Sequence, residues 1–182
     1  MTEGQHATPG EQVAQALGDL LRRSARSRVY GALTTGLGPA LDEATYPVLS
    51  GLARTGPATA ARLAADVGLD RSVVSRHADR LEAAGLLRRD PDPADRRGTL
   101  LVLTGAGRRA VTEMRRRLAA QLDDYLGAWP AADAAAFARF LTRFTEDLTA
   151  PLSGSGRSAV ARLFATGKIN RVKITQDNGL PL

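Results

Sequence analysis

The stretch from Thr59 to Gly107 constrains the fold more than any other part of this 182-residue chain. A short helical pattern leads through a turn at Gly68 into a second one, DRSVVSRHADRLEAAG, and two apolar runs then flank the loop DPDPADRRG. The prolines, aspartates and glycine of that loop are typical of a hairpin turn. The order predicts a helix-turn-helix followed by a wing, which together can present one helix and one hairpin to a DNA duplex.

The second helix of this motif has an apolar face and a polar face. Val74, Ala78 and Leu81 are spaced four and three residues apart and are expected to face the core. Asp70 is expected to cap the first turn through its carboxylate, and Gly85 to end the helix in a left-handed conformation. The polar face carries Arg71, Ser72, Ser75, Arg76 and Arg80. Hydroxyl and guanidinium groups suit base edges and phosphates, although a charged outer face is also common on helices that bind nothing.

The loop between the two apolar runs is expected to form the tip of a projecting hairpin. Leu86 to Arg89 precede it and Thr99 to Leu103 follow it, which predicts a wing of two or three strands. Asp95 precedes Arg97 by two residues, and we expect these side chains to pair, which would hold the guanidinium extended. An extended arginine suits a narrow minor groove, where the electrostatic potential is most negative.

The segment DPADRRGTLLVLTGAG, from Asp92 to Gly107, resembles the winged helix-turn-helix of the MarR family of bacterial transcriptional regulators. The family's most recognisable marks are the D-x-R of the wing and the LTxxG that opens the next helix. They correspond here to Asp95, Arg96 and Arg97, and to Leu103, Thr104 and Gly107. The resemblance extends from about Leu17 to Leu148 and implies a homodimer that binds double-stranded DNA.

The resemblance also implies how the DNA is contacted. The expected contacts are Ser72, Ser75 and Arg76 in the major groove, Arg97 in the adjacent minor groove, and Arg71 and Arg80 on phosphates. A two-fold dimer predicts a pseudo-palindromic operator with half-sites about 34–36 Å apart. We expect a repressor that a small-molecule effector releases from this operator; a winged-helix adaptor that binds proteins and not DNA is the alternative.

The chain is expected to be mainly α-helical, with dimerisation helices on both sides of the winged domain. Asp42, Thr59 and Thr104 are each expected to cap the helix that follows them, and Pro130 is expected to open the last helix. We predict a flexible N-terminus over 1–10, a dimerisation helix over 11–41, the winged domain over 42–103, dimerisation helices over 104–150, and a linker and tail over 151–182. The apolar stripe of the first helix contains Leu17 and Leu21, and that of the last contains Phe137, Phe140 and Phe144. We expect these stripes to pair between two copies; packing within one chain is the alternative for the phenylalanines.

The last sixteen residues differ in composition from the rest of the chain. No Lys, Ile or Asn occurs before Lys168, yet GKINRVKITQDNGLPL contains two of each. Residues 157–182 are therefore expected to include either a natural appendage or a segment foreign to the parent gene. Of the net charge of +6, the residues from Arg157 onward carry +4. DNA binding consequently has to be inferred from local arginines and not from net charge.

Other functional classes lack the residues that they need. The chain has no cysteine, which excludes disulfides, thiolate metal sites and a thiol-based peroxide sensor. The two histidines, His6 and His77, are distant in sequence, and no HExxH motif, Ser-His-Asp set or phosphate-binding glycine loop is present. We expect no catalytic residues, no metal and no cofactor. Without a membrane span or a secretion signal, a cytoplasmic protein is expected.

Regulators of the resembled family commonly respond to small aromatic or anionic molecules. The candidate effector residues here are Arg22, Arg26, Tyr30 and Tyr46. The arginines of 115–117 are most simply a solvated helix face, with a contact to flanking DNA or an anchor for an anionic ligand as alternatives. His77 is expected to be a part-buried packing residue, with a phosphate contact or a pH-sensitive role as alternatives.

Overall fold

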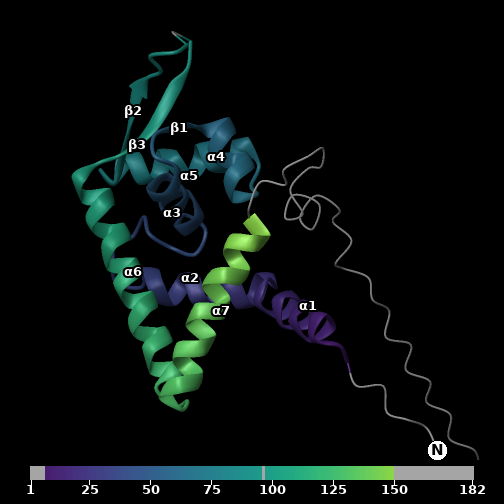
Figure 1. Ribbon diagram of the computed structural model, residues 1–182. Coiled ribbons are helices and arrows are strands. Elements are labelled where there is room, and N and C mark those ends of the chain that lie inside the picture. Colours follow the sequence, from purple (N-terminus) through teal and green to yellow (C-terminus); the bar gives the residue numbers. More distant parts are fainter. Residues whose placement is uncertain (1–6, 96, 150–182) are drawn as a thin grey trace, which may run out of the picture. The chain divides into compact units, whose positions relative to one another are not determined.

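The computed structural model describes residues 7–95 and 97–149, so the expectations for Arg96 and for residues 151–182 lie outside the described residues. The chain forms two compact units, Met1–Asp124 and Tyr125–Leu182. Its elements, labelled in Figure 1, are α1 (Pro9–Leu20), α2 (Arg23–Thr34), α3 (Tyr46–Thr55), β1 (Ala58–Thr59), α4 (Ala60–Val67), α5 (Arg71–Ala83), β2 (Leu87–Pro91), β3 (Thr99–Leu103), α6 (Gly105–Leu126) and α7 (Ala131–Thr149). None of the helices within the described ranges is long and apolar enough to cross a membrane.

Helices α3, α4 and α5, the small sheet and the start of α6 enclose the core of the first unit. The buried side chains of this core are Leu41, Val48, Leu49, Leu52, Ala58, Leu63, Ala64, Val74, Ala78, Leu81, Leu87, Leu101, Val111 and Met114. The predicted apolar face of α5 is thereby confirmed. Each large aliphatic side chain contributes about 1.5–3 kcal/mol on burial, which holds together helices too short to be stable alone.

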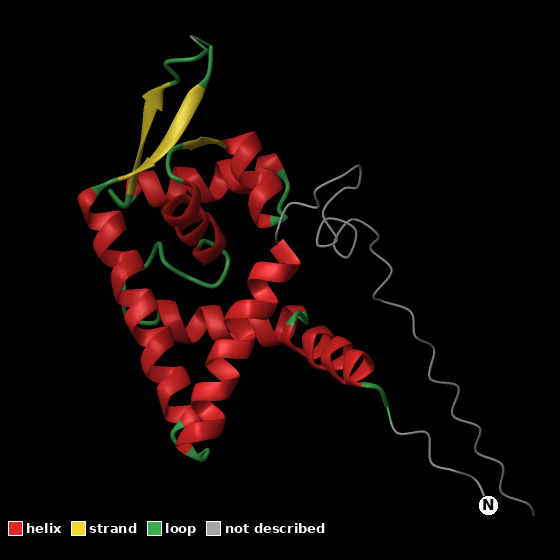
Figure 2. Cartoon of the chain, in the orientation of Figure 1, coloured by secondary structure: helices red, strands yellow, loops and turns green. Residues whose placement is uncertain are grey.

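The sheet is antiparallel, with the strand order β1-β3-β2. β2 and β3 pair from Leu87↔Leu103 to Pro91↔Thr99, and they form the predicted wing, which extends away from the helices (Figure 2). β1 adds only two residues, with Ala58 opposite Leu101. A strand of that length shows no alternation of apolar and polar residues, so the sequence did not indicate it.

Glycines with positive φ end both helices of the helix-turn-helix. Gly68 (φ 68°) ends α4, and Gly85 (φ 70°) follows α5. The amides of Gly85 and Leu86 donate to the carbonyls of Glu82 and Leu81 at 2.8 and 2.9 Å, the paired pattern of a left-handed helix stop. The predicted role of Gly85 is confirmed, and the turn leads the chain directly into β2.

Thr104 and Gly107 fix the start of α6 against that turn. The Thr104 hydroxyl accepts the N–H of Gly107 at 3.1 Å and donates to the Gly85 carbonyl at 2.6 Å. A Cβ atom on Gly107 would lie 1.9 Å from the Leu86 carbonyl oxygen, so a side chain here would force the two segments apart. The LTxxG segment therefore joins the wing to the end of α5.

The prediction of a single helix over 11–41 is wrong, because the structure has two helices, α1 and α2, in this part of the chain. α1 begins at Pro9, because Thr8 and Glu11 form a capping box, and it is separated from α2 at Leu21 and Arg22. Arg22 has an extended backbone (φ -57°, ψ 139°), and Gly18 lowers the helix stability of the preceding turn by about 1 kcal/mol. α1 buries none of its side chains, so no packing offsets this weakness.

The described helix of the second unit, α7, begins directly after Pro130, as predicted. Trp129 packs edge-on against Phe137, with the ring centroids 5.4 Å apart and an interplanar angle of 63°. Phe137, Phe140 and Phe144 are nevertheless 43%, 64% and 37% exposed. Over the described part of α7, the apolar stripe is thus partly to largely exposed.

Candidate nucleic-acid interface

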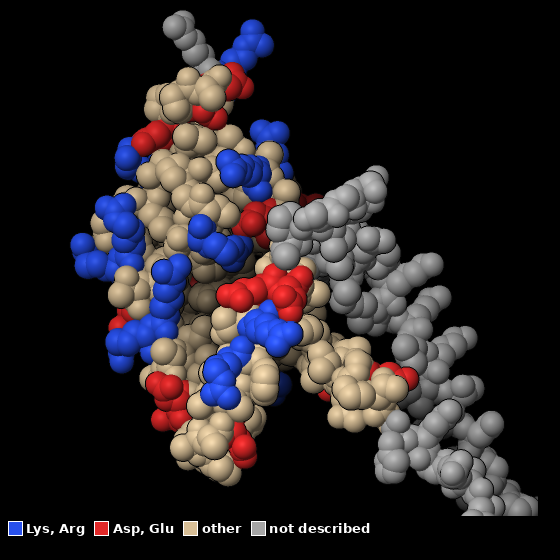
Figure 3. All heavy atoms as spheres, viewed as in Figure 1, with Lys and Arg blue, Asp and Glu red and all other residues tan. Residues whose placement is uncertain are grey.

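The outer face of α5 presents most of its predicted DNA-binding side chains to solvent. Arg71, Ser72 and Arg76 are exposed, and Ser75 is half-buried. The arginines that form ion pairs with described carboxylates are Arg22, Arg54, Arg80, Arg88, Arg89, Arg116, Arg117 and Arg143. Within the described part of the chain, Arg71 and Arg76 are therefore not neutralised by a carboxylate. Figure 3 shows further basic side chains over α6 and at the end of the wing.

α5 begins at the predicted residue but without the predicted hydrogen bond. Asp70 is the N-cap (φ -70°, ψ 144°), and its carbonyl accepts the N–H of Val74 at 3.0 Å. Its carboxylate accepts no hydrogen bond from the helix, so the expected carboxylate cap is wrong. At the start of α4, by contrast, the predicted cap is present: the Thr59 hydroxyl accepts the N–H of Arg62 at 3.2 Å.

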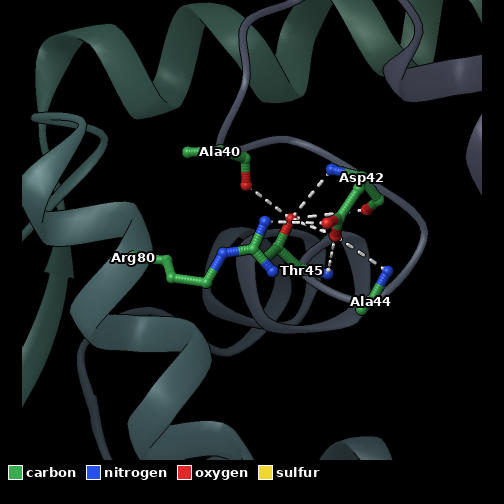
Figure 4. Close-up of polar contacts among 5 residues, drawn as sticks. All are labelled: Ala40, Asp42, Ala44, Thr45 and Arg80. Carbon is green, nitrogen blue, oxygen red and sulfur yellow. Dashed lines mark hydrogen bonds and ion pairs between the residues drawn. The ribbon is translucent and has the colours of Figure 1, made fainter.

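Arg80 has an intramolecular partner that sequence reasoning missed (Figure 4). Its guanidinium donates to Oδ2 of Asp42 at 2.8 Å. Oδ1 of the same carboxylate accepts the N–H groups of Ala44 and Thr45 at 3.0 and 2.9 Å. The buried Thr45 hydroxyl donates to the Ala40 carbonyl at 2.8 Å. These contacts tie the second half of α5 to the loop between α2 and α3.

The surroundings of Asp42 favour its charged form. Burial raises the pKa of this carboxyl, but the Arg80 guanidinium and the amide and hydroxyl of Thr45 lower it by more, so the pKa lies below its ordinary value. Asp42 was expected to cap α3; it closes the preceding turn instead, and Thr45 is the N-cap. The phosphate contact expected of Arg80 stays a prediction. A phosphate bound there would have to use the guanidinium group that also bonds Asp42.

Two aspartates shape the tip of the wing. The Asp92 carboxylate accepts the N–H of Ala94 and the Asp95 carboxylate that of Arg97, both at 2.9 Å. The expected pairing of the Asp95 and Arg97 side chains is wrong, because Asp95 binds the backbone of Arg97 and no ion pair joins these two described side chains. Asp95 therefore sets the turn. The Arg97 side chain is exposed.

The predicted effector residues are only partly brought together. Tyr30 of α2 and Tyr46 of α3 are stacked, with ring centroids 4.3 Å apart and an interplanar angle of 24°. Arg22 forms a surface ion pair with Asp19 at 2.8 Å, and Arg26 is exposed on α2. Sequence reasoning identified the two tyrosines but not the arginines whose charges act on Tyr46.

Of these arginines, Arg115 lies on α6 and Arg54 lies on α3, the helix that also carries Tyr46. Burial raises the pKa of the Tyr46 hydroxyl, as does Tyr30, whereas the charges of Arg115 and Arg54 lower it; the net shift is upward. Arg115 also lines a groove of about 380 Å³ in the first unit. The groove is lined by Leu52, Ala53, Gly56, Pro57, Val102, Leu103, Arg108, Val111, Thr112 and Arg115. An apolar wall with guanidinium groups suits an amphipathic anion.

A helix-turn-helix with an attached two-stranded hairpin and an uncovered basic helix face defines a winged-helix protein of the DNA-binding type. The MarR family model matches residues 35–98. The uncharacterized HTH-type transcriptional regulator YxaD of Bacillus subtilis is 30% identical over 106 residues, which cover 58% of this chain and 74% of that protein. The chain belongs to the MarR family of transcriptional regulators.

Solved structures agree with this family. Apo MarR from E. coli has a similar fold, with a TM-score of 0.60 and 20% identity over 77% of this chain and 98% of that chain. BpsR of Bordetella bronchiseptica, whose DNA binding is regulated by 6-hydroxynicotinic acid, has a TM-score of 0.50 and 29% identity over 74% of this chain and 99% of that chain. These relatives are transcription regulators.

Proposed function

We propose that this chain is a homodimeric repressor that binds a pseudo-palindromic operator and leaves it when a small aromatic anion binds. The proposed DNA binding rests on three arginines whose side chains are exposed and unpaired among the described residues. Arg71, Arg76 and Arg97 are exposed, form no ion pair with a described carboxylate, and lie on the recognition helix α5 and at the end of the wing. Free guanidinium groups on a recognition helix and on a wing can each meet phosphates or base edges.

The uncovered apolar residues support the homodimer. Phe137, Phe140 and Leu141 of α7 are 43%, 64% and 45% exposed, and an apolar helix face of this kind is commonly covered by association. A two-fold axis would give each dimer two recognition helices. Half-sites about 34–36 Å apart would then be contacted at once.

The stacked tyrosines support an effector site of the first unit. Tyr30 and Tyr46 offer flat apolar surface, and the nearby Arg115 and Arg54 offer positive charge. BpsR responds to 6-hydroxynicotinic acid, an aromatic carboxylic acid, and a ligand of that class would find complementary groups here. Arg115, which forms no ion pair with a described carboxylate, replaces Arg22 and Arg26 as the favoured charge partner, whereas Arg54 is already paired with Asp66.

Fluorescence anisotropy on the gene's own upstream DNA, measured over a range of salt concentrations, tests the proposal. Arg97→Ala is expected to weaken operator binding by about 1–3 kcal/mol, the usual value for a base-contacting arginine. Arg139→Ala on α7, a helix of the second unit, removes the same charge and serves as the control. Unchanged affinity for Arg97→Ala would contradict the assignment of the wing. Absence of any salt-dependent binding by the wild type would favour the adaptor.

A further inference from the structure

Arg89 links the wing to the recognition helix. It lies on β2, its side chain is 30% exposed, and its Nη2 donates to Oδ1 of Asp79 on α5 at 2.7 Å. Its Nη1 donates to Glu82, one turn further along α5. One guanidinium thus bonds two carboxylates of a helix while its own backbone is paired with Leu101 of β3.

The neighbouring arginine makes no such link. Arg88 pairs with Asp90 of the same strand, and because side chains alternate along a strand it faces the opposite side of the sheet. The two adjacent arginines therefore have the same charge but bond different partners. Of these two arginines, Arg89 is the one that forms ion pairs with another described element, α5.

The chemistry of the link favours a fixed geometry. Burial lowers the pKa of Arg89, but Asp79 and Glu82 raise it by more, so the group remains charged. A planar guanidinium that bonds two carboxylates has little freedom to turn, unlike a lysine ammonium. The link spans the turn at Gly85, the one connection of the chain between α5 and β2.

We propose that Arg89 is a positioning residue for DNA recognition. It holds the wing in one orientation relative to α5, so that Arg76 and Arg97 are placed to meet the duplex together. This inference rests on the proposed DNA binding. A preorganised pair of binding elements loses less conformational freedom when it docks, which increases affinity without a new contact.

One double variant is expected to change DNA affinity in opposite directions under the two competing explanations. Asp79→Asn with Glu82→Gln removes negative charge from the helix that faces DNA, so simple electrostatics predicts tighter binding. The positioning role predicts weaker binding instead, by about tenfold, and a similar loss for Arg89→Ala. Arg89→Lys, which can retain one ion pair, is expected to recover part of the loss. Arg88→Ala is the matched control and is expected to stay within about twofold of the wild type.

The salt dependence separates positioning from contact. If Arg89 contacts a phosphate, Arg89→Ala is expected to reduce the slope of log K against log salt concentration by about one unit. If Arg89 only positions the wing, the slope is expected to stay unchanged.

Amide hydrogen exchange of the free protein gives a readout that needs no DNA: Arg89→Ala is expected to accelerate exchange over residues 87–95 and 97–103, and Arg88→Ala is not. Tighter binding of the Asp79/Glu82 variant, or unaltered exchange in Arg89→Ala, would overturn the inference. Failure of the wild type to bind DNA would overturn the proposed function while leaving the exchange result to decide the link itself.

Discussion

His77 carries the single side-chain polar atom within residues 7–95 and 97–149 that is buried without a hydrogen-bond partner, its Nδ1. Burial lowers the pKa of the imidazole, Arg80 and Arg76 lower it further, and Asp42 acts in the opposite sense. The folded chain therefore favours the neutral ring. That environment supports the packing role expected from the position of His77 between Val74 and Leu81.

Replacing His77 with leucine is expected to increase the free energy of unfolding, and more at pH 5.5 than at pH 7.5. An unpaired buried polar atom costs about 1–3 kcal/mol, which leucine avoids. The unfolded chain has an ordinary histidine pKa near 6.5, and the folded chain has a lower one. Between these values the unfolded state binds more protons, so wild-type stability falls as the pH drops through this window.

Urea unfolding at the two pH values measures this difference. An equal effect of His77→Leu at both pH values would contradict the lowered pKa.

Single polar residues show where sequence reasoning succeeds and where it fails. Thr59 and Thr104 were predicted as caps and are caps, because a hydroxyl next to its backbone reaches only the nearest amides. Asp42 and Asp95 were assigned the wrong acceptor roles, since several amides lie within reach of a loop carboxylate. The choice among them depends on backbone angles that the sequence does not show. The partners of Arg80 and Arg89 were missed because both contacts join separate elements.

Among the elements, those bounded by strong local signals were predicted well. α5 ends at a glycine with positive φ, and α6 begins after a capping threonine. The break between α1 and α2 was missed, because Leu21 and Arg22 are ordinary helix formers and only tertiary packing decides whether the helix continues there. β1 was missed because it exists only through its pairing with β3.

The two N-caps of the helix-turn-helix allow a test at the scale of the helix. Thr59→Ala is expected to lower the free energy of unfolding by about 1 kcal/mol, because it removes a hydroxyl that accepts an amide of α4. Asp70→Ala is expected to cost less than half as much, since its carboxylate makes no such bond. Denaturation followed by circular dichroism at about 0.5 M salt measures both, because salt screens the residual attraction of Asp70 to the helix dipole. Equal losses would show that Asp70 caps α5 in solution.

For the whole molecule, the sequence predicted the presence of an uncovered apolar stripe but not what covers it. Phe137, Phe140 and Phe144 recur at helical spacing, and that spacing is local information. The sequence shows that this stripe needs a covering surface, but it does not show which residues of a second chain provide that surface. The exposure of Phe140 agrees with the need for such a surface.

Phe140→Glu is expected to give a folded monomer that binds operator DNA weakly. The side chain is 64% exposed, so its replacement costs the single chain little, whereas a charge at the centre of an apolar interface is strongly unfavourable. Losing the second recognition helix removes the avidity of two linked half-sites, which lowers affinity by a factor on the order of 100 or more. Sedimentation velocity and operator anisotropy follow the two effects. Arg139→Glu on the opposite side of α7 is the control and is expected to remain a dimer; if Phe140→Glu also sediments as a dimer, the stripe of α7 does not form the interface.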